Sequence, residues 1–175
     1  MMNTEWVLNA ELGPMDTTVR TIIERLQLKP HPEGGYYREL HRSSLTVQPN
    51  DGRPERAALT TIYFLLPAGV TSSWHRVASD EVWHHMDGAP VELLVSDPDW
   101  RSVVRHTVGP LREGAEPEAV VPPHHWQAAR STGTYSVVCC VVGPGFDFAD
   151  FDLLKDLPDE HARSLKEQPA YASLG

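Results

Sequence analysis

The stretch GVTSSWHRVASDEVWHHMDG, residues 69–88, decides how the rest of the chain is interpreted. Two glycines bound it, and apolar segments of β character flank it, TTIYFLL before and APVELLV after. As strand, turn and strand, it places His75 near the end of one strand and Glu81 at the start of the next, so both side chains can point at one spot. An imidazole nitrogen with a carboxylate oxygen suits a divalent transition metal or a general acid/base pair. The stretch therefore predicts a β-hairpin that carries chemistry.

Further short β-type segments lie on both sides of this hairpin and are separated by turns rich in glycine and proline. They cover residues 36–41, 57–66, 89–95, 102–108, 119–121, 124–129 and 134–142. No helical pattern intervenes between them, and this arrangement is typical of an antiparallel sandwich or barrel. The sequence therefore predicts an all-β fold.

A short helix is expected at each end of this β region. Asp16 is placed to cap a helix over residues 17–28, in which apolar residues recur at the i, i+3, i+4 and i+7 spacing of one helix face. A second helix is predicted over residues 153–168, where Asp159 and Glu160 favour its N-terminus. Residues 1–15 lack periodicity and are expected to form a loose arm, which leaves residues 16–175 as one domain.

Bulk composition excludes several classes of function. A chain of 175 residues with 41% hydrophobic and 22% charged residues has the size and composition of one soluble globular domain. Its net charge of −9 offers no basic footprint for nucleic acid. No stretch approaches the ~20 apolar residues of a membrane span, and the start lacks a signal-peptide pattern. We expect a cytoplasmic protein in which the adjacent Cys139 and Cys140 form no structural disulfide, because neighbours on a strand point to opposite faces.

The spacing of Gly69, His75, Val77, Glu81 and Gly88 resembles the first cupin motif, in which a second His normally stands at the position of Val77. The second cupin motif is similar to PPHHWQ at residues 122–127, where His124 takes the Gly position and Gln127 the last His position. The segments HPEGGYYREL (from His31) and GPGFDFADFDLL (from Gly143) resemble a small cupin branch long labelled only as a domain of unknown function.

This resemblance covers residues 20 to 155 and is specific for the fold. It implies a single antiparallel jelly-roll barrel, a small-molecule substrate bound inside the barrel, and a homodimer. It says little about the reaction, because cupins include oxygenases, epimerases, isomerases, decarboxylases and binding proteins.

The leading hypothesis is a metal-dependent oxidoreductase or oxygenase that acts on a small organic metabolite. The motif match implies His75, Glu81 and Gln127 as ligands of Fe, Ni, Mn, Co, Cu or Zn, with open positions for water, substrate or dioxygen. Strand alternation allows His85 to join the catalytic residues and His125 to face the same pocket, provided that no bulge reverses the alternation.

Two alternatives keep the pocket and omit the metal. In a metal-independent epimerase or isomerase of a sugar-nucleotide-like or keto substrate, His75 is the base, Glu81 orients it, and a tyrosine is the acid. The candidate tyrosines and the other predicted substrate contacts are Tyr63, Tyr37, Tyr135, Arg38, Trp83 and His125. In a non-catalytic binding protein, His75 and Glu81 form only a buried hydrogen-bonded pair.

Overall fold

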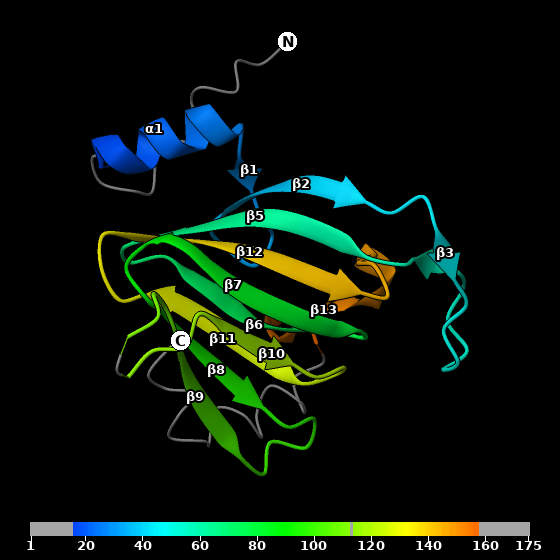
Figure 1. The fold of residues 1–175 in the computed structure, drawn as a ribbon. Coiled ribbons are helices and arrows are strands. Elements are labelled where there is room, and N and C mark those ends of the chain that lie inside the picture. The colour runs from blue at the N-terminus through cyan, green and yellow to red at the C-terminus, as the bar shows by residue number, and fades with distance from the viewer. Residues whose placement is uncertain (1–15, 113, 158–175) are drawn as a thin grey trace.

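The computed structural model describes residues 16–112 and 114–157, which form two antiparallel sheets facing each other (Figure 1). One sheet has the strand order β1-β2-β5-β12-β7-β10 and the other has the order β13-β6-β11-β8-β9, while β3 and β4 form a separate hairpin. The strands are β1 Lys29–Pro30, β2 Tyr36–Arg42, β3 Thr46–Val47, β4 Arg56–Ala57, β5 Thr60–Pro67, β6 Thr71–Val77, β7 Asp80–Gly88, β8 Val91–Ser96, β9 Val103–Val108, β10 Glu118–Val121, β11 Trp126–Ser131, β12 Tyr135–Gly143 and β13 Phe151–Leu153. The predicted antiparallel jelly roll is confirmed.

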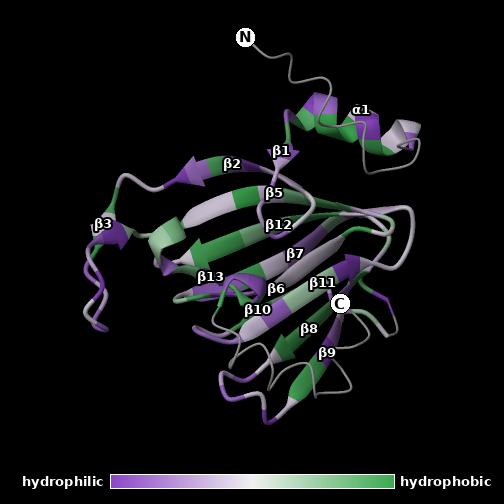
Figure 2. Ribbon diagram, turned by 180° about the vertical axis from the view of Figure 1, so that it is seen from behind, coloured by the Kyte–Doolittle hydropathy of each residue, from purple (hydrophilic) through white to green (hydrophobic). Residues whose placement is uncertain are grey.

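The main core lies between the two sheets, where inward side chains from both fill the barrel. Its buried members are Phe64, Leu66, Trp83, Val91, Leu93, Val95, Val108, Ala119, Val121, Ala129, Val138 and Cys140. Figure 2 shows β8 and β12 as apolar over most of their length. Every residue of β8 is buried, because this strand is covered on both faces. Leu93 and Val95 face the barrel interior, whereas Leu94 packs with Trp74 and Trp126 on the outside of the five-stranded sheet.

Helix α1, Thr17–Leu26, covers one end of the six-stranded sheet (Figure 1). Its apolar stripe buries Val19 against Leu65 and Val137, in a cluster separate from the barrel core. The Asp16 side chain caps it by accepting hydrogen bonds from the backbone N–H groups of Thr18 at 2.8 Å and Val19 at 3.3 Å. The predicted N-terminal helix and its cap are thus confirmed. No helix in the described part of the chain is long and apolar enough to cross a membrane.

Replacement of Asp16 by alanine removes the acceptor for two helix N–H groups, and we expect it to destabilise the protein by about 1 kcal/mol. Urea unfolding followed by circular dichroism measures this loss. Asp16→Asn keeps a capping oxygen and should restore most of the stability. Equal losses in both variants would show that the charge rather than the cap matters.

The C-terminal region differs from the predicted helix over residues 153–168. Phe151–Leu153 form the edge strand β13 on β6, with Phe151 opposite Val77 and Leu153 opposite His75. Two short 3-10 helices flank it, Phe148–Asp150 and Leu154–Asp156. Pairing with β6 satisfies the backbone of this segment before a helix can begin. The remainder of the predicted helix, from residue 158, and the predicted arm of residues 1–15 lie outside the described residues.

Candidate functional site

A cavity of about 400 Å³ opens inside the barrel. Its inner end is polar, one wall is apolar and largely aromatic, and its mouth carries exposed charged side chains. The inner polar residues are His31, Glu33, His75, Glu81 and Cys140; the apolar residues are Tyr37, Ile62, Phe64, Val77, Val142, Phe146, Phe148 and Phe151; and the remaining lining residues are Lys29, Glu39, Arg42, Thr60 and Asp147.

His75, on β6, lies at the inner end of the cavity and is only 2% exposed. Its Nδ1 is 2.8 Å from the carbonyl oxygen of Ser73. A carbonyl oxygen only accepts hydrogen bonds, so Nδ1 carries a proton. This fixes the ring and directs Nε2 toward the carboxylate of Glu33, whose Oε2 lies 3.3 Å away.

Glu33 reaches His75 because of local backbone geometry on both sides. It precedes Gly34 and Gly35, which have φ angles of +114° and +70°, and a Cβ at Gly34 would collide with the backbone of Thr71. In β6 a bulge between Ser72 and His75 places both side chains on Glu33, although residues three apart on a regular strand face opposite ways. The Ser72 hydroxyl donates to Glu33 Oε1 at 2.9 Å.

The two buried carboxyl groups beside His75 have pKa values displaced in opposite directions. Burial raises the pKa of Glu33, but the positive charge that His75 carries when it is protonated, with hydrogen bonds from His31 and Ser72, outweighs burial and leaves this pKa below its ordinary value. Burial raises the pKa of Glu81, and the negative charge of Glu33 adds to that increase. The two carboxyls therefore differ in protonation: Glu33 favours its ionised form, whereas Glu81 holds its proton to higher pH and is the one suited to act as an acid.

Gln127, predicted as a metal ligand, is fully buried and absent from the cavity lining. Trp83 Nε1 donates to its Oε1 at 2.9 Å, and its Nε2 donates to Glu81 Oε2 at 2.6 Å. Because the indole N–H can only donate, the amide oxygen is committed to Trp83. Gln127 therefore orients Glu81 and has no oxygen directed at the cavity.

The remaining donors do not fit a metal centre. Val77 lines the cavity at the position where the first cupin motif normally has its second His. Glu33 already contacts three neighbours: His31 Nδ1 at 3.3 Å, His75 and Ser72. Among residues 16–112 and 114–157, no three His, Cys, Asp or Glu side chains are arranged to hold a metal ion. We derive no chemical step through a metal.

Strand β2 supplies two residues of the cavity lining. Tyr37 and Glu39 face the cavity, whereas Arg38 lies on the opposite face, 5.6 Å from the centroid of the Tyr63 ring. A bulge between Glu39 and His41 then shifts the alternation, so that Arg42 rather than His41 reaches the cavity. Tyr63, a predicted catalytic acid, packs under α1.

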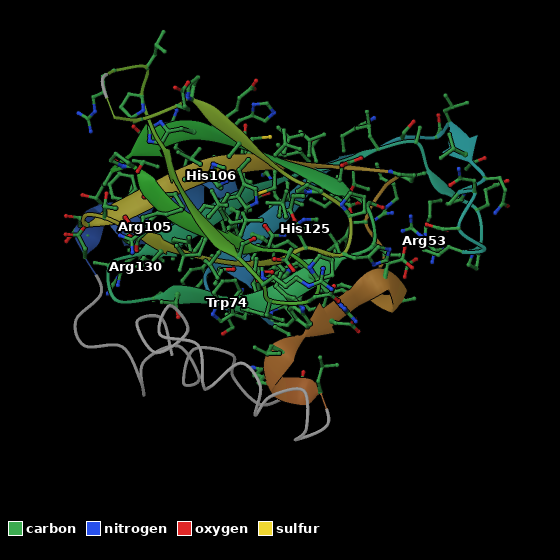
Figure 3. All side chains as sticks on the ribbon, turned by 90° about the horizontal axis from the view of Figure 1, so that it is seen from below. Arg53, Trp74, Arg105, His106, His125 and Arg130 are labelled. Carbon is green, nitrogen blue, oxygen red and sulfur yellow. The ribbon has the colours of Figure 1, made fainter. Side chains whose placement is uncertain are left out.

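The other predicted contacts lie away from the cavity. Trp83 and Phe64 pack edge to face and fill the barrel beyond Glu81, so that His85, further along β7, does not reach the cavity. The hydroxyl of Tyr135 donates to Asp87 at 3.1 Å. His125 comes from the turn before β11 (Figure 3), where its Nδ1 is 3.2 Å from the carbonyl oxygen of Pro123.

Sequence reasoning missed Glu33, His31 and the aromatic wall as site residues. The Gly34–Gly35 pair was a usable signal, because a turn of that kind can bring a preceding carboxylate against another strand. Residues 146–151 alternate aromatic and acidic side chains, a pattern that by itself predicts apolar side chains inward and carboxylates outward. Phe146 and Phe151 do line the cavity, but Phe148 is 54% exposed at its mouth.

Segment 146–151 is held in place by Asp150, which joins it to the β3–β4 hairpin. Arg56 donates two hydrogen bonds to Asp150, each of 2.8 Å, and Arg53 donates a third at 3.0 Å. Figure 3 shows Arg53 at the end of the molecule that carries this hairpin. The hydrogen bonds from Arg56 make the largest contribution to lowering the pKa of Asp150. The aromatic wall is thus fixed by an ion-paired cluster outside the two sheets.

Comparisons with known proteins agree with this architecture. Residues 20–154 match the profile of the family described as Cupin superfamily (DUF985). A hypothetical protein from Leishmania major is 33% identical, with a TM-score of 0.78 over 89% of this chain and 97% of that one. A protein of known crystal structure from Shewanella oneidensis is 29% identical, with a TM-score of 0.75 over 89% of this chain and 95% of that one.

More distant similarity extends to enzymes of the same fold. Oxalate decarboxylase from Bacillus subtilis is 16% identical, with a TM-score of 0.56 over 83% of this chain and 36% of that one. At this identity the likeness shows the fold alone. A comparison with curated proteins found no match.

Proposed function

We propose that this chain, which belongs to the DUF985 family of the cupin superfamily, catalyses metal-independent proton transfer on a small organic substrate, as an isomerase or epimerase does. The observation that carries this proposal is the buried His75, whose Nε2 faces the ionised Glu33 at 3.3 Å while a second buried carboxyl, Glu81, has a raised pKa. The commitment of Gln127 to Trp83 and Glu81 supports it over the metal-dependent alternative.

The three groups suit proton abstraction from a carbon next to a carbonyl group. Neutral His75 accepts the proton of the C–H bond at Nε2, and the Glu33 carboxylate stabilises the resulting imidazolium. Glu81, which retains its proton to higher pH than an ordinary carboxyl, donates it to the carbonyl oxygen to form the enol. Return of a proton to carbon and recovery of the other by Glu81 complete an isomerisation or epimerisation without a redox partner.

The test is solvent exchange at carbon. Keto acids, keto sugars and sugar nucleotides are incubated with the protein in deuterated buffer, and loss of the proton signal next to the carbonyl is followed by NMR. Exchange above the buffer rate with at least one class supports the proposal. A ligand that binds without exchange would favour the non-catalytic binding protein instead.

Metal removal provides an independent check. Because the donor set does not fit a metal centre, protein purified without chelating resin should contain only substoichiometric transition metal by mass spectrometry. Treatment with EDTA should leave the exchange rate unchanged. Stoichiometric metal that disappears in His75→Ala would return the metal-dependent oxygenase hypothesis to first place.

The predicted homodimer stays a prediction, which light scattering on the purified protein would test.

A further inference from the structure

The charged side chains at the mouth of the cavity differ in whether they already have a hydrogen-bond or ion-pair partner. Glu39 is ion-paired with Arg42 at 2.7 Å, and Arg42 also donates to the carbonyl oxygen of Phe146 at 3.0 Å. Asp147 accepts a hydrogen bond from the backbone N–H of Ala149 at 2.9 Å. The mouth carboxylates therefore already have partners of their own.

Lys29 is different. It lies on the short edge strand β1, is exposed, and lines the cavity. Its Nζ lies 5.0 Å from the centroid of the Tyr37 ring, and no carboxylate oxygen of the described part of the chain is within ion-pairing distance. An ammonium held over an aromatic ring at the mouth of a cavity is placed to meet an anionic group of a ligand.

The aromatic wall lines the same cavity as this ammonium. Phe146, Phe148 and Phe151 pack against one another at centroid distances of 5.0 to 6.1 Å. Phe148 also stacks toward His31, with an interplanar angle of 23° and a centroid distance of 6.3 Å. A phenylalanine that is 54% exposed beside a cavity offers a ring face that a flat apolar group can cover.

We infer that the substrate is a flat, apolar organic anion, whose carboxylate or phosphate meets Lys29 while its body lies against Phe148 and its reactive end reaches His75. This inference rests on the proposed function for the direction of the reactive end, but the binding part stands independently. Lys29 then selects for the anionic group of the substrate, and the aromatic wall selects for its flat body.

The experiment uses unreactive probes, so that binding is measured without turnover. Isothermal titration of the full chain compares 4-phenylbutanoate with its neutral amide and with 4-phenylbutylamine, which share the same aromatic body. We expect the anion to bind about threefold to fivefold more tightly than the amide, as an exposed charge pair allows. The preference should shrink as salt is added.

Variants assign the two contacts separately. Lys29→Gln should remove the preference for the anion and Lys29→Arg should keep it, while Arg20→Gln, on the exposed face of α1, is the matched control. Phe148→Ala should weaken the anion and the amide alike, by about fivefold. Equal or tighter binding of the amine, an unchanged preference in Lys29→Gln, or no binding of any probe would overturn the inference. Charge-selective binding without carbon exchange in any substrate would instead overturn the proposed function alone.

Discussion

His75→Gln is expected to slow carbon-bound proton exchange by about 10²- to 10⁴-fold, the range that general acid–base groups contribute. Glutamine has no group that accepts a proton near neutral pH, and it breaks the contact between His75 Nε2 and Glu33 Oε2. The measurement is the exchange rate by NMR at saturating substrate, because a binding role would change the KM and leave kcat nearly intact.

The matched control is His84→Gln, the same substitution at a partly exposed position outside the cavity, where His84 pairs with Glu118. It should leave exchange unchanged. Thermal unfolding of both variants separates loss of chemistry from loss of fold, because His75 is buried and its removal leaves Glu33 with fewer partners. A folded His75→Gln protein with near-normal exchange would show that His75 is not the base.

Gln127→Leu is expected to cause the largest loss of stability from a single change in this site. It leaves two buried polar groups without partners, the indole N–H of Trp83 and Oε2 of Glu81. Each orphaned group costs about 1–3 kcal/mol, so a total loss of about 2–6 kcal/mol is expected. Urea unfolding measures the loss.

A double-mutant cycle identifies the cause. Trp83→Phe removes the orphaned donor in advance, so the loss caused by Gln127→Leu should be smaller in that background. In a variant that stays folded, the activity profile should also move: the hydrogen bond from Gln127 lowers the pKa of Glu81, and its loss raises that pKa further. Glu81 then stays protonated to higher pH, so the limb that reports its deprotonation shifts upward. A fully additive cycle would show that the hydrogen-bonded chain does not carry the effect.

The fold could be predicted from the sequence because each strand carries its own signal. Alternating apolar residues, turns of glycine and proline, and the absence of helical periodicity between strands are local features, and Asp16 is a local cap. The site was less predictable because it depends on the positions at which a bulge interrupts the alternation of inward and outward side chains. Bulges in β2 and β6 bring Arg42 to the cavity and Ser72 onto Glu33, and no residue type in those strands marks a bulge.

The role of Gln127 depended on a partner distant in the sequence. Its spacing in the second motif predicts a ligand, but Trp83 contacts it across the barrel and commits its amide oxygen. Glu33 likewise becomes a site residue only when the Gly34–Gly35 turn brings it against β6. A motif gives the position of a side chain along a strand, whereas its hydrogen-bond partners come from the packing of other strands.

The ion-paired cluster of Asp150 with Arg53 and Arg56 holds the aromatic wall from outside the strands that carry His75 and Glu81. The groups to which we assign proton transfer lie on barrel strands and next to one tight turn, where a change alters strand pairing or buried charge. The aromatic wall belongs to segment 146–151, which Arg56 and Arg53 pin from outside the sheets. Phe146 and Phe148 lie outside the strands, so we expect their exchange to leave strand register untouched as long as Asp150 stays, whereas Phe151 begins β13 and pairs with β6. A library confined to positions 146 and 148 is therefore the economical route to a changed choice of ligand.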